Sequence, residues 1–467
     1  MPYYQPNGGT VHVLSHCDAD GAAAAAVVLQ YYPDAQVVIT NYHKPVHLNQ
    51  YKAGDTLFVT DFSLKYEMFK EIERRNVRII WIDHHESAIN QLNAAGFECE
   101  GIRRTDYSGA MLTWLYFNKD KSPEQAPYFL KLVNWYDLWQ HDKDPNVRPF
   151  QFGLGLWDTR PGYAPGKKFW GTLFEVGTGD KLLENAIKYG KIIENYVNQL
   201  HTLLCNDLAY KTSVRMMNGS TRSIIAMAIR PGNSQVFEKY EGASDSDGNM
   251  TYQYFGGNTR QYKCSIYSPP NTSKIILDIV QQYGGGGHPS AAGFNYPSIP
   301  VELPVITKPV PLEEAVAKYE KIYALRKSSS ILLRFADRSN GITAKVCGWH
   351  TFIANIKCMA FNYYYLPEML TTLPSSVDCI DQDDGEIPEV YVGFVLTNSG
   401  YYRCCAYPTG TSVDMTKVLD KLQSHYMKQI TDDCYQLRKI NDGIWWYAKE
   451  PPVNIPINLN ASGSFNN

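Results

Sequence analysis

The chain has 467 residues, 44% of them hydrophobic, and carries a formal net charge of −3 at pH 7. Since a single hydrophobic core seldom grows beyond about 250 to 300 residues, the length predicts two or three domains. The weakly negative charge gives no support to a large basic surface for long nucleic acids. No stretch approaches the ~18 consecutive apolar residues of a membrane span, the N-terminus shows no signal-peptide pattern, and the ten cysteines show no C-x-x-C spacing. These features predict a cytoplasmic protein with reduced thiols and no membrane partner.

Strands and helices alternate through the first 116 residues, which is typical of βαβ units and a mainly parallel sheet. The apolar runs predict strands at Val11–Leu14, Val37–Thr40, Thr56–Thr60 and Val77–Ile82. The segments between and after them predict helices at Ala22–Tyr32, Leu64–Arg75 and Gly109–Phe117, and a helical, aromatic-rich stretch over residues 125–141.

The second half of the chain predicts a smaller α/β lobe followed by a further α+β region. A long helix over Leu182–Leu208 would connect the two halves. The smaller lobe has predicted strands at Ser223–Ile229 and Gln261–Tyr267, a polar loop at Glu241–Met250 and an amphipathic helix at Thr272–Tyr283. The further region has a predicted helix at Glu313–Leu325 and strands at Ser330–Phe335 and Val390–Leu396. The predicted order is a first domain (1–180), a connecting helix (181–215), a smaller second domain (216–297), a Pro-rich linker (298–312), an additional domain of unknown role (313–450) and a tail (451–467).

The most informative residues are Asp83, His84 and His85, which follow the apolar run at 77–82. The carboxyl ends of parallel strands are where α/β enzymes place their chemistry. Two adjacent histidines on an extended segment face opposite sides, so we expect one to bind a metal and the other to face the substrate.

Acidic residues end two other predicted strands. His16, Asp18 and Asp20 alternate after the first strand, so an extended backbone would point all three side chains the same way. The alternative is that Asp18 or Asp20 merely caps the following helix. Asp61 ends another strand, where a lone Asp is commonly a turn or N-cap residue.

Asp137 lies among large apolar residues, where an unpaired carboxylate would be costly. A metal ion would remove that cost, and the alternative is satisfaction by backbone N–H groups or by Arg148. Carboxylates combined with a few imidazoles suit Mn²⁺ or Mg²⁺ better than zinc. The whole set is large enough for two ions that share one carboxylate, the arrangement that hydrolyses phosphoesters.

Four glycines, Gly284 to Gly287, precede His288. Glycine backbone N–H groups can approach an anion closely, and His288 could add a donor to a phosphate oxygen. A flexible linker is the alternative for such a run.

These motifs resemble those of the DHH/DHHA1 phosphoesterases, which include RecJ-type exonucleases, nano-RNases, cyclic-dinucleotide phosphodiesterases and pyrophosphate hydrolases. The stretch from His16 to Gly21 is similar to the first motif of that family, Asp61 to the second, Asp83–His85 to the third, Asp137 to the fourth and Gly284–His288 to the glycine motif of the smaller lobe. The H-x-D-x-D-G form of the first motif is similar to the nano-RNase branch.

The resemblance implies two Mn²⁺ ions, with Mg²⁺ as the alternative metal. One ion would be bound by His16, Asp18 and Asp61, and the other by Asp20, Asp61, His84 and Asp137. Asp83 and His85 would be the catalytic residues, with His85 near the scissile phosphate. The substrate would be held by His288, Gly285, Gly286, Gly287, Arg260 and Tyr267. Many family members carry Arg where this chain has Tyr267, so Arg260 or Lys263 would have to supply that charge.

The sequence therefore predicts a Mn²⁺-dependent phosphodiesterase that hydrolyses short oligonucleotides to mononucleotides. The alternatives are a small-molecule phosphohydrolase, acting on a cyclic dinucleotide, phosphoadenosine phosphate or pyrophosphate, and a non-enzymatic scaffold that retained the fold. The predicted partner is a short oligonucleotide or another phosphoester, and a homodimer stays open.

Overall fold

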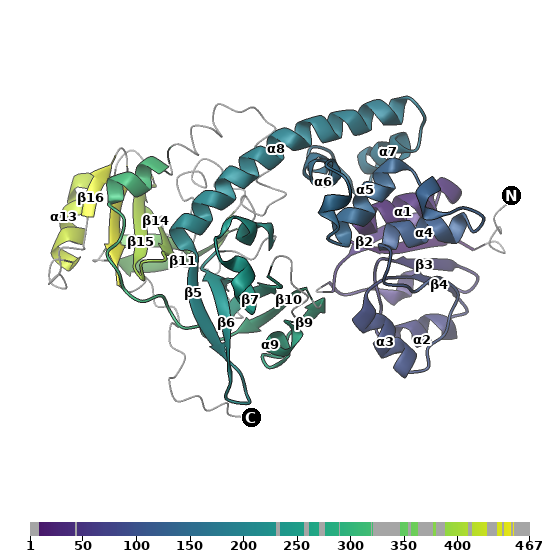
Figure 1. Cartoon of the computed structure of the whole chain (residues 1–467), viewed down its shortest axis with the longest axis horizontal. Coiled ribbons are helices and arrows are strands. Elements are labelled where there is room, and N and C mark those ends of the chain that lie inside the picture. Colours follow the sequence, from purple (N-terminus) through teal and green to yellow (C-terminus); the bar gives the residue numbers. More distant parts are fainter. Residues whose placement is uncertain are drawn as a thin grey trace. The chain divides into compact units, whose positions relative to one another are not determined.

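The computed structural model forms two compact units, Met1–Tyr196 and Val197–Asn467 (Figure 1). Both combine helices with β-sheets, which confirms the predicted α/β class. The residues that the structure describes are 9–42, 44–229, 234–255, 261–269, 276–288, 290–318, 320, 346–353, 356–362, 377–379, 388–409, 413–426, 437–440, 443–449 and 452.

The first unit contains a four-stranded sheet in which every pair of neighbouring strands is parallel. Its strands, in spatial order, are β2 (Gln36–Thr40), β1 (Val11–His16), β3 (Thr56–Thr60) and β4 (Arg78–Ile82). All four predicted strands are therefore present, within one or two residues of their predicted bounds. Because the strands run in the same direction, the motifs that follow β1, β3 and β4 leave the sheet at one edge.

Helices cover both faces of this sheet (Figure 1). Phe58 packs with the core on one face, whereas its neighbours Leu57 and Val59 pack on the other, as the two-residue period of a strand requires. One face is covered by α1 (Ala19–Tyr31), α4 (Gly109–Phe117) and α5 (Tyr128–Asp137), and the other by α2 (Tyr66–Arg74) and α3 (Glu86–Ala94). Burial on both faces explains why β3 and β4 read as continuous apolar runs.

Three more helices complete the first unit and lead out of it: α6 (Val147–Leu154), α7 (Ala164–Leu173) and α8 (Thr178–Leu208). The last of these is the predicted long helix, which begins four residues earlier than expected. Within the part of the chain that the structure describes, no helix combines the length and apolar character needed to cross a bilayer.

The second unit contains two sheets. The six-stranded sheet has the order β5 (Tyr210–Arg215), β6 (Thr221–Met227), β7 (Gly248–Phe255), β8 (Gln261–Tyr267), β10 (Ala291–Tyr296) and β9 (Gly286–His288). The seven-stranded sheet has the order β13 (Val377–Cys379), β11 (Val346–Ile353), β12 (Ile356–Asn362), β14 (Val390–Leu396), β15 (Tyr402–Pro408), β17 (Gly443–Ala448) and β16 (Leu437–Ile440). Its helices include α9 (Leu277–Gln281) and α13 (Met415–Tyr426).

Several predictions for this unit need correction. The loop expected at Glu241–Met250 already contains the start of β7, because Gly248 and its successors pair with β6. The helix expected at Thr272–Tyr283 is shorter, and residues 270–275 lie outside the described residues. The strand expected at Ser330–Phe335 and most of the predicted tail also lie outside them, whereas residues 312–318 are helical as predicted.

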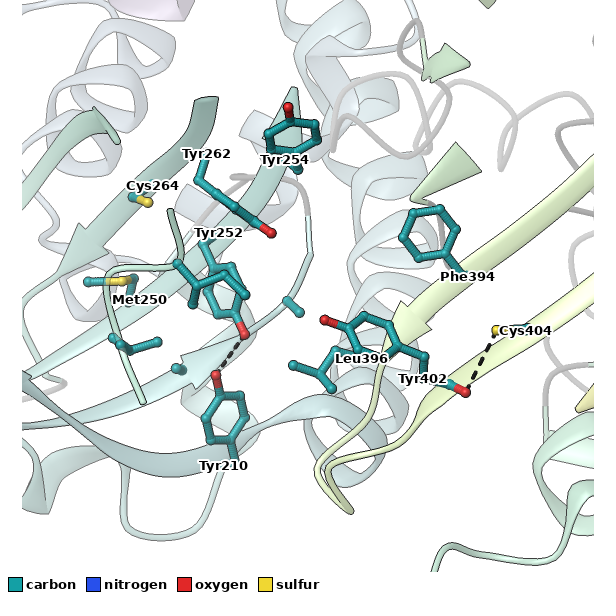
Figure 2. Packing of buried hydrophobic residues seen from close by; sticks show 14 of the residues in the cluster. Tyr210, Met250, Tyr252, Tyr254, Tyr262, Cys264, Phe394, Leu396, Tyr402 and Cys404 are labelled. Carbon is teal, nitrogen blue, oxygen red and sulfur yellow. Dashed lines mark hydrogen bonds between the residues drawn. The ribbon is translucent and has the colours of Figure 1, made fainter. Parts of the chain in front are cut away.

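The two sheets of the second unit share one hydrophobic core. Figure 2 shows Tyr210 and Tyr252 of the six-stranded sheet facing Leu396 and Tyr402 of the seven-stranded sheet. The hydroxyl oxygens of Tyr210 and Tyr252 lie 2.6 Å apart and form a buried hydrogen bond. Residues before and after the Pro-rich stretch at 298–312 thus contribute to a common interior.

Candidate metal centre

Six of the predicted metal ligands come together at the carboxyl edge of the four-stranded sheet. Three overlapping trios have ligand atoms within 4.8 Å of one another, and Asp61 belongs to two of them. The trios are His16 with Asp18 and Asp61; Asp61 with His84 and His85; and Asp20 with His84 and Asp137.

The first motif does not have the extended backbone that was predicted from its sequence. The strand ends at His16, Asp18 is the N-cap of α1, and Asp20 already lies in its first turn. Asp18 caps the helix, as the alternative predicted, because one carboxylate oxygen accepts from Gly21 N at 2.9 Å. Its other oxygen lies 2.6 Å from His16 Nδ1. Asp20 does not cap its own helix. Its two oxygens accept hydrogen bonds from backbone N–H groups at the N-terminus of α4.

Asp61 is the centre of the arrangement. It is 1% exposed, its backbone has a left-handed φ of 51°, and neither carboxylate oxygen has a hydrogen-bond partner within the described part of the chain. Its Oδ1 lies 3.2 Å from His84 Nε2 and 3.9 Å from His85 Nδ1, and its Oδ2 lies 3.9 Å from His16 Nδ1. A buried carboxylate that no donor satisfies is costly, so these oxygens are suited to a cation.

Asp137 ends α5, and its Oδ2 lies 3.3 Å from His84 Nε2. Among the residues that the structure describes, this buried oxygen has no hydrogen-bond partner. Arg148 Nε lies 2.9 Å from Glu194 Oε1.

The two histidines of the third motif do not face opposite sides. β4 ends at Ile82, and the rings of His84 and His85 have centroids 4.6 Å apart, both within reach of Asp61. Asp83 is fully buried and holds this turn together. Its Oδ1 lies 2.7 Å from His85 Nδ1 and accepts from His84 N at 2.8 Å, while Ser63 donates to its Oδ2. Asp83 therefore orients His85 rather than facing the other ligands.

The charges of the cluster are unbalanced without a cation. Burial, followed by the negative charges of Asp20 and Asp18, raises the pKa of Asp61 well above its usual range, and the same causes raise the pKa of Asp137. Burial also lowers the pKa of His84, which favours the neutral imidazole that metals bind. The donor set of carboxylate oxygens and imidazole nitrogens therefore fits Mn²⁺ or Mg²⁺.

Gly109, the first residue of α4, is not among the site residues predicted from the sequence. Its N–H donates to Asp20 Oδ2 at 2.6 Å, and the next N–H, of Ala110, donates to Oδ1 at 3.0 Å. A Cβ at position 109 would lie 2.5 Å from the Asp61 Cβ and 3.0 Å from Asp20 Oδ2. The local signal was present: Ser108 before an apolar helix is an N-cap, and a helix N-terminus attracts a carboxylate. Which carboxylate it attracts depends on a contact 89 residues away.

We expect Gly109→Ala to lower metal-dependent activity by more than about 10-fold, the lower range for disturbing groups around metal ligands. The added methyl group has to displace Asp61, Asp20 or the start of α4. Activity and Mn²⁺ affinity of the purified variant measure the effect. Gly171→Ala in α7 is the matched control, since a Cβ there meets nothing within 4 Å. Unchanged Mn²⁺ affinity in Gly109→Ala would show that the site is more adaptable than its geometry indicates.

The predicted substrate-binding residues belong to the second unit. Gly286 to His288 form the edge strand β9, in which Gly287 pairs with Ala292 and has a φ of 148°. The glycine run is thus part of a sheet edge rather than a flexible linker. Gly285 directly precedes this strand, and a Cβ there would lie 2.3 Å from Gly293 O.

The other two substrate-binding predictions have different outcomes. Tyr267 ends β8 and is 8% exposed, and burial raises the pKa of its hydroxyl. Its ring lies 6.4 Å from that of Phe237. Arg260 lies outside the described residues. Contact of any of these residues with substrate stays a prediction.

No family model matches the chain. An uncharacterized protein of Acanthamoeba polyphaga mimivirus is 25% identical over 264 residues, which are 53% of this chain and 55% of that protein. The chain thus spans about half the length of the curated relative it matches.

Two similar solved structures are RecJ in complex with Mn²⁺ from Thermus thermophilus and the pGpG-specific phosphodiesterase PggH from Vibrio cholerae. The first has 12% identity and a TM-score of 0.35, over 94% of this chain and 68% of that chain. The second has 12% identity and a TM-score of 0.33, over 68% of this chain and 100% of that chain. Likenesses of this size carry no argument about activity, which has to rest on the geometry of the site.

Proposed function

We propose that the protein is a metal-dependent phosphodiesterase that uses Mn²⁺ to hydrolyse short oligonucleotides to mononucleotides. The observation that carries this proposal is Asp61, a buried carboxylate with two unsatisfied oxygens that lies within reach of three imidazoles. A carboxylate in that position can bridge two cations.

In this proposal, the trio of His16, Asp18 and Asp61 would hold one ion. The trio of Asp20, His84 and Asp137 would hold the other together with Asp61, whose Oδ1 lies 3.2 Å from His84 Nε2. When bound, such a pair of cations supplies positive charge for a phosphate and lowers the pKa of water into the neutral range. Asp20 is fixed for this role by the two N–H groups of α4.

His85 has a separate role in the proposal. Burial alone would lower its pKa, but the hydrogen bond with Asp83 and the negative charges of Asp83, Asp18 and Asp20 together raise it. A protonated imidazole beside the cluster adds a positive charge and a proton donor next to the phosphoryl oxygens. Asp83 acts as its positioning residue, because it fixes the ring through Nδ1.

The small net charge favours a short substrate, since long polymers reward proteins that make many phosphate contacts. A panel of 5′-labelled oligoribonucleotides of two to twenty nucleotides, incubated with Mn²⁺ or with EDTA, tests the proposal. We expect mononucleotide products from the shortest members with Mn²⁺ and none with EDTA. Pyrophosphate, phosphoadenosine phosphate and a cyclic dinucleotide are assayed in parallel. If only one of these is hydrolysed, the protein is a small-molecule phosphohydrolase and oligonucleotides are not its substrates. Absence of all hydrolysis would favour a non-enzymatic scaffold.

A further inference from the structure

An exposed aromatic ring lies beside the candidate metal centre. Tyr42 follows β2 by two residues and is 54% exposed, although it belongs to a unit with a large apolar core. Its ring stacks on Phe62, with centroids 4.6 Å apart and ring planes 29° from parallel. Phe62 is 3% exposed and directly follows Asp61, so the stacked pair rests on the same backbone as the central carboxylate.

The position of Tyr42 relative to the histidines is defined. Its ring centroid lies 5.8 Å from that of His16 and 6.3 Å from that of His85. Tyr42 therefore adjoins two residues of the candidate centre while more than half of it is exposed.

An exposed tyrosine is usually surface packing, in which the ring covers an apolar neighbour and has no further role. Two observations argue for more than packing here. Phe62 stacks against the ring, and Tyr42 is still 54% exposed. In addition, its ring contacts those of His16, a predicted metal ligand, and His85, a predicted catalytic residue.

We propose that Tyr42, backed by Phe62, is a stacking platform for a nucleobase attached to the phosphate that the metal centre binds. Every nucleobase presents a flat face, so stacking does not depend on which base is bound. An aromatic side chain at this place therefore selects phosphoesters that carry a base over pyrophosphate or polyphosphate. This inference rests on the proposed phosphodiesterase function and narrows its substrate class to nucleotides. It assigns Tyr42 to substrate recognition and not to the chemical step.

A kinetic comparison tests the platform. The substrates are a 5′-phosphorylated diribonucleotide and its abasic counterpart, which has the same phosphates and sugars. We expect Tyr42→Leu to raise KM for the diribonucleotide at least about fivefold, the lower range for loss of one base–aromatic stack, with kcat little changed. KM for the abasic substrate should be unchanged. Tyr42→Phe, which keeps the ring, should stay within about twofold of wild type for both substrates.

Tyr163→Leu is the matched control, because Tyr163 is 59% exposed in the same unit and contacts Arg160 instead. An equal change for both substrates in Tyr42→Leu would overturn the proposal, since the ring would then support the site or the phosphate. No change for either substrate would also overturn it.

A binding measurement separates failure of the platform from failure of the proposed function. AMP and ribose 5-phosphate share phosphate and sugar, and calorimetric titration in Mn²⁺ compares them without any hydrolysis. We expect AMP to bind wild type at least about fivefold more tightly, and this preference to be lost in Tyr42→Leu. If AMP binds more tightly as expected but the diribonucleotide is not hydrolysed, the stacking platform stands and the proposed phosphodiesterase activity is wrong. If the diribonucleotide is hydrolysed but AMP and ribose 5-phosphate bind equally well, the activity stands and the platform is wrong.

Discussion

Replacing Asp61 by Asn should abolish Mn²⁺-dependent stabilisation of the first unit, and at the same time make the metal-free protein more stable. In the absence of cations, burial and the nearby carboxylates of Asp20, Asp18 and Asp137 disfavour the charged form of Asp61 and raise its pKa. Two like charges a few Å apart repel by roughly 4 kcal/mol at an effective dielectric constant of 20. Asn keeps the shape of the side chain and removes this charge.

The choice of Asn follows from the backbone. Asp61 has a φ of 51°, a conformation that Asn adopts readily and Ala does not. Asp61→Asn therefore isolates the charge, whereas Asp61→Ala adds backbone strain. We expect the metal-free stability to rise by about 1 kcal/mol or more for Asn, because only part of the repulsion is relieved when neighbouring carboxyls take up protons. Asp61→Ala should gain less or lose stability.

Denaturant unfolding with Mn²⁺ and with EDTA measures both effects. Wild type should gain about 2.7 kcal/mol at a Mn²⁺ concentration 100 times its Kd, and Asp61→Asn should gain none. Activity should fall by more than about 100-fold, beyond the usual loss from residues that only support metal ligands. Asp158→Asn, at an exposed ion pair with Arg160, is the control and should leave Mn²⁺ stabilisation unchanged. A metal-free Asp61→Asn that is less stable than wild type would mark Asp61 as a structural residue.

The positions of several site residues could be predicted because they follow from the topology of the parallel sheet. Parallel strands of a doubly covered sheet read as unbroken apolar runs, and polar residues after such runs have to meet at one edge. That reasoning located Asp61 and Asp83 at strand ends, and the structure places them there. The alternation rule applied to His16, Asp18 and Asp20 failed, because the capping preference of Asp18 starts the helix at Ala19.

Other features of the site depend on contacts that local sequence does not encode. The pairing of Asp20 with the N-terminus of α4 joins residues 89 positions apart. The orientation of His84 and His85 depends on the buried carboxylate of Asp83 and on Ser63, which is 20 positions away. Periodicity indicates which face of an element is buried, but it does not indicate which distant residue lies against that face.

The second unit shows the same limit on a larger scale. Strand β8 has the bounds predicted from its composition, as does β14. Their sheets were not predictable in the same way, since β6 pairs with β7 and β12 with β14 in parallel, across intervening segments. A Pro-rich stretch between two sets of strands predicted separate domains, whereas Figure 2 shows tyrosines from both sets in one core.

Ending the chain after Pro297 should therefore unfold the second unit and leave the first unit able to bind Mn²⁺. The truncation would remove Phe394, Tyr402 and Trp446 from the shared core and expose Tyr252 and Tyr262, which are 2% and 1% exposed in the full chain. An exposed apolar patch of this kind leads to loose packing and aggregation. We expect the truncated protein to bind a hydrophobic dye, to lose the unfolding transition of the second unit and to retain the Mn²⁺-dependent transition of the first.

A single substitution tests the same core without deleting any chain. Trp446→Ala should lower the free energy of unfolding of the second unit by about 3 to 5 kcal/mol, as expected for a large side chain that is 1% exposed. Lys417→Ala on α13 is the control, since its side chain is 80% exposed. If the second unit of the truncated chain unfolds at the same denaturant concentration as in the full protein, the six-stranded sheet is an independent domain. Loss of its transition together with destabilisation by Trp446→Ala would show that the region after residue 312 is needed to fold the predicted substrate-binding lobe.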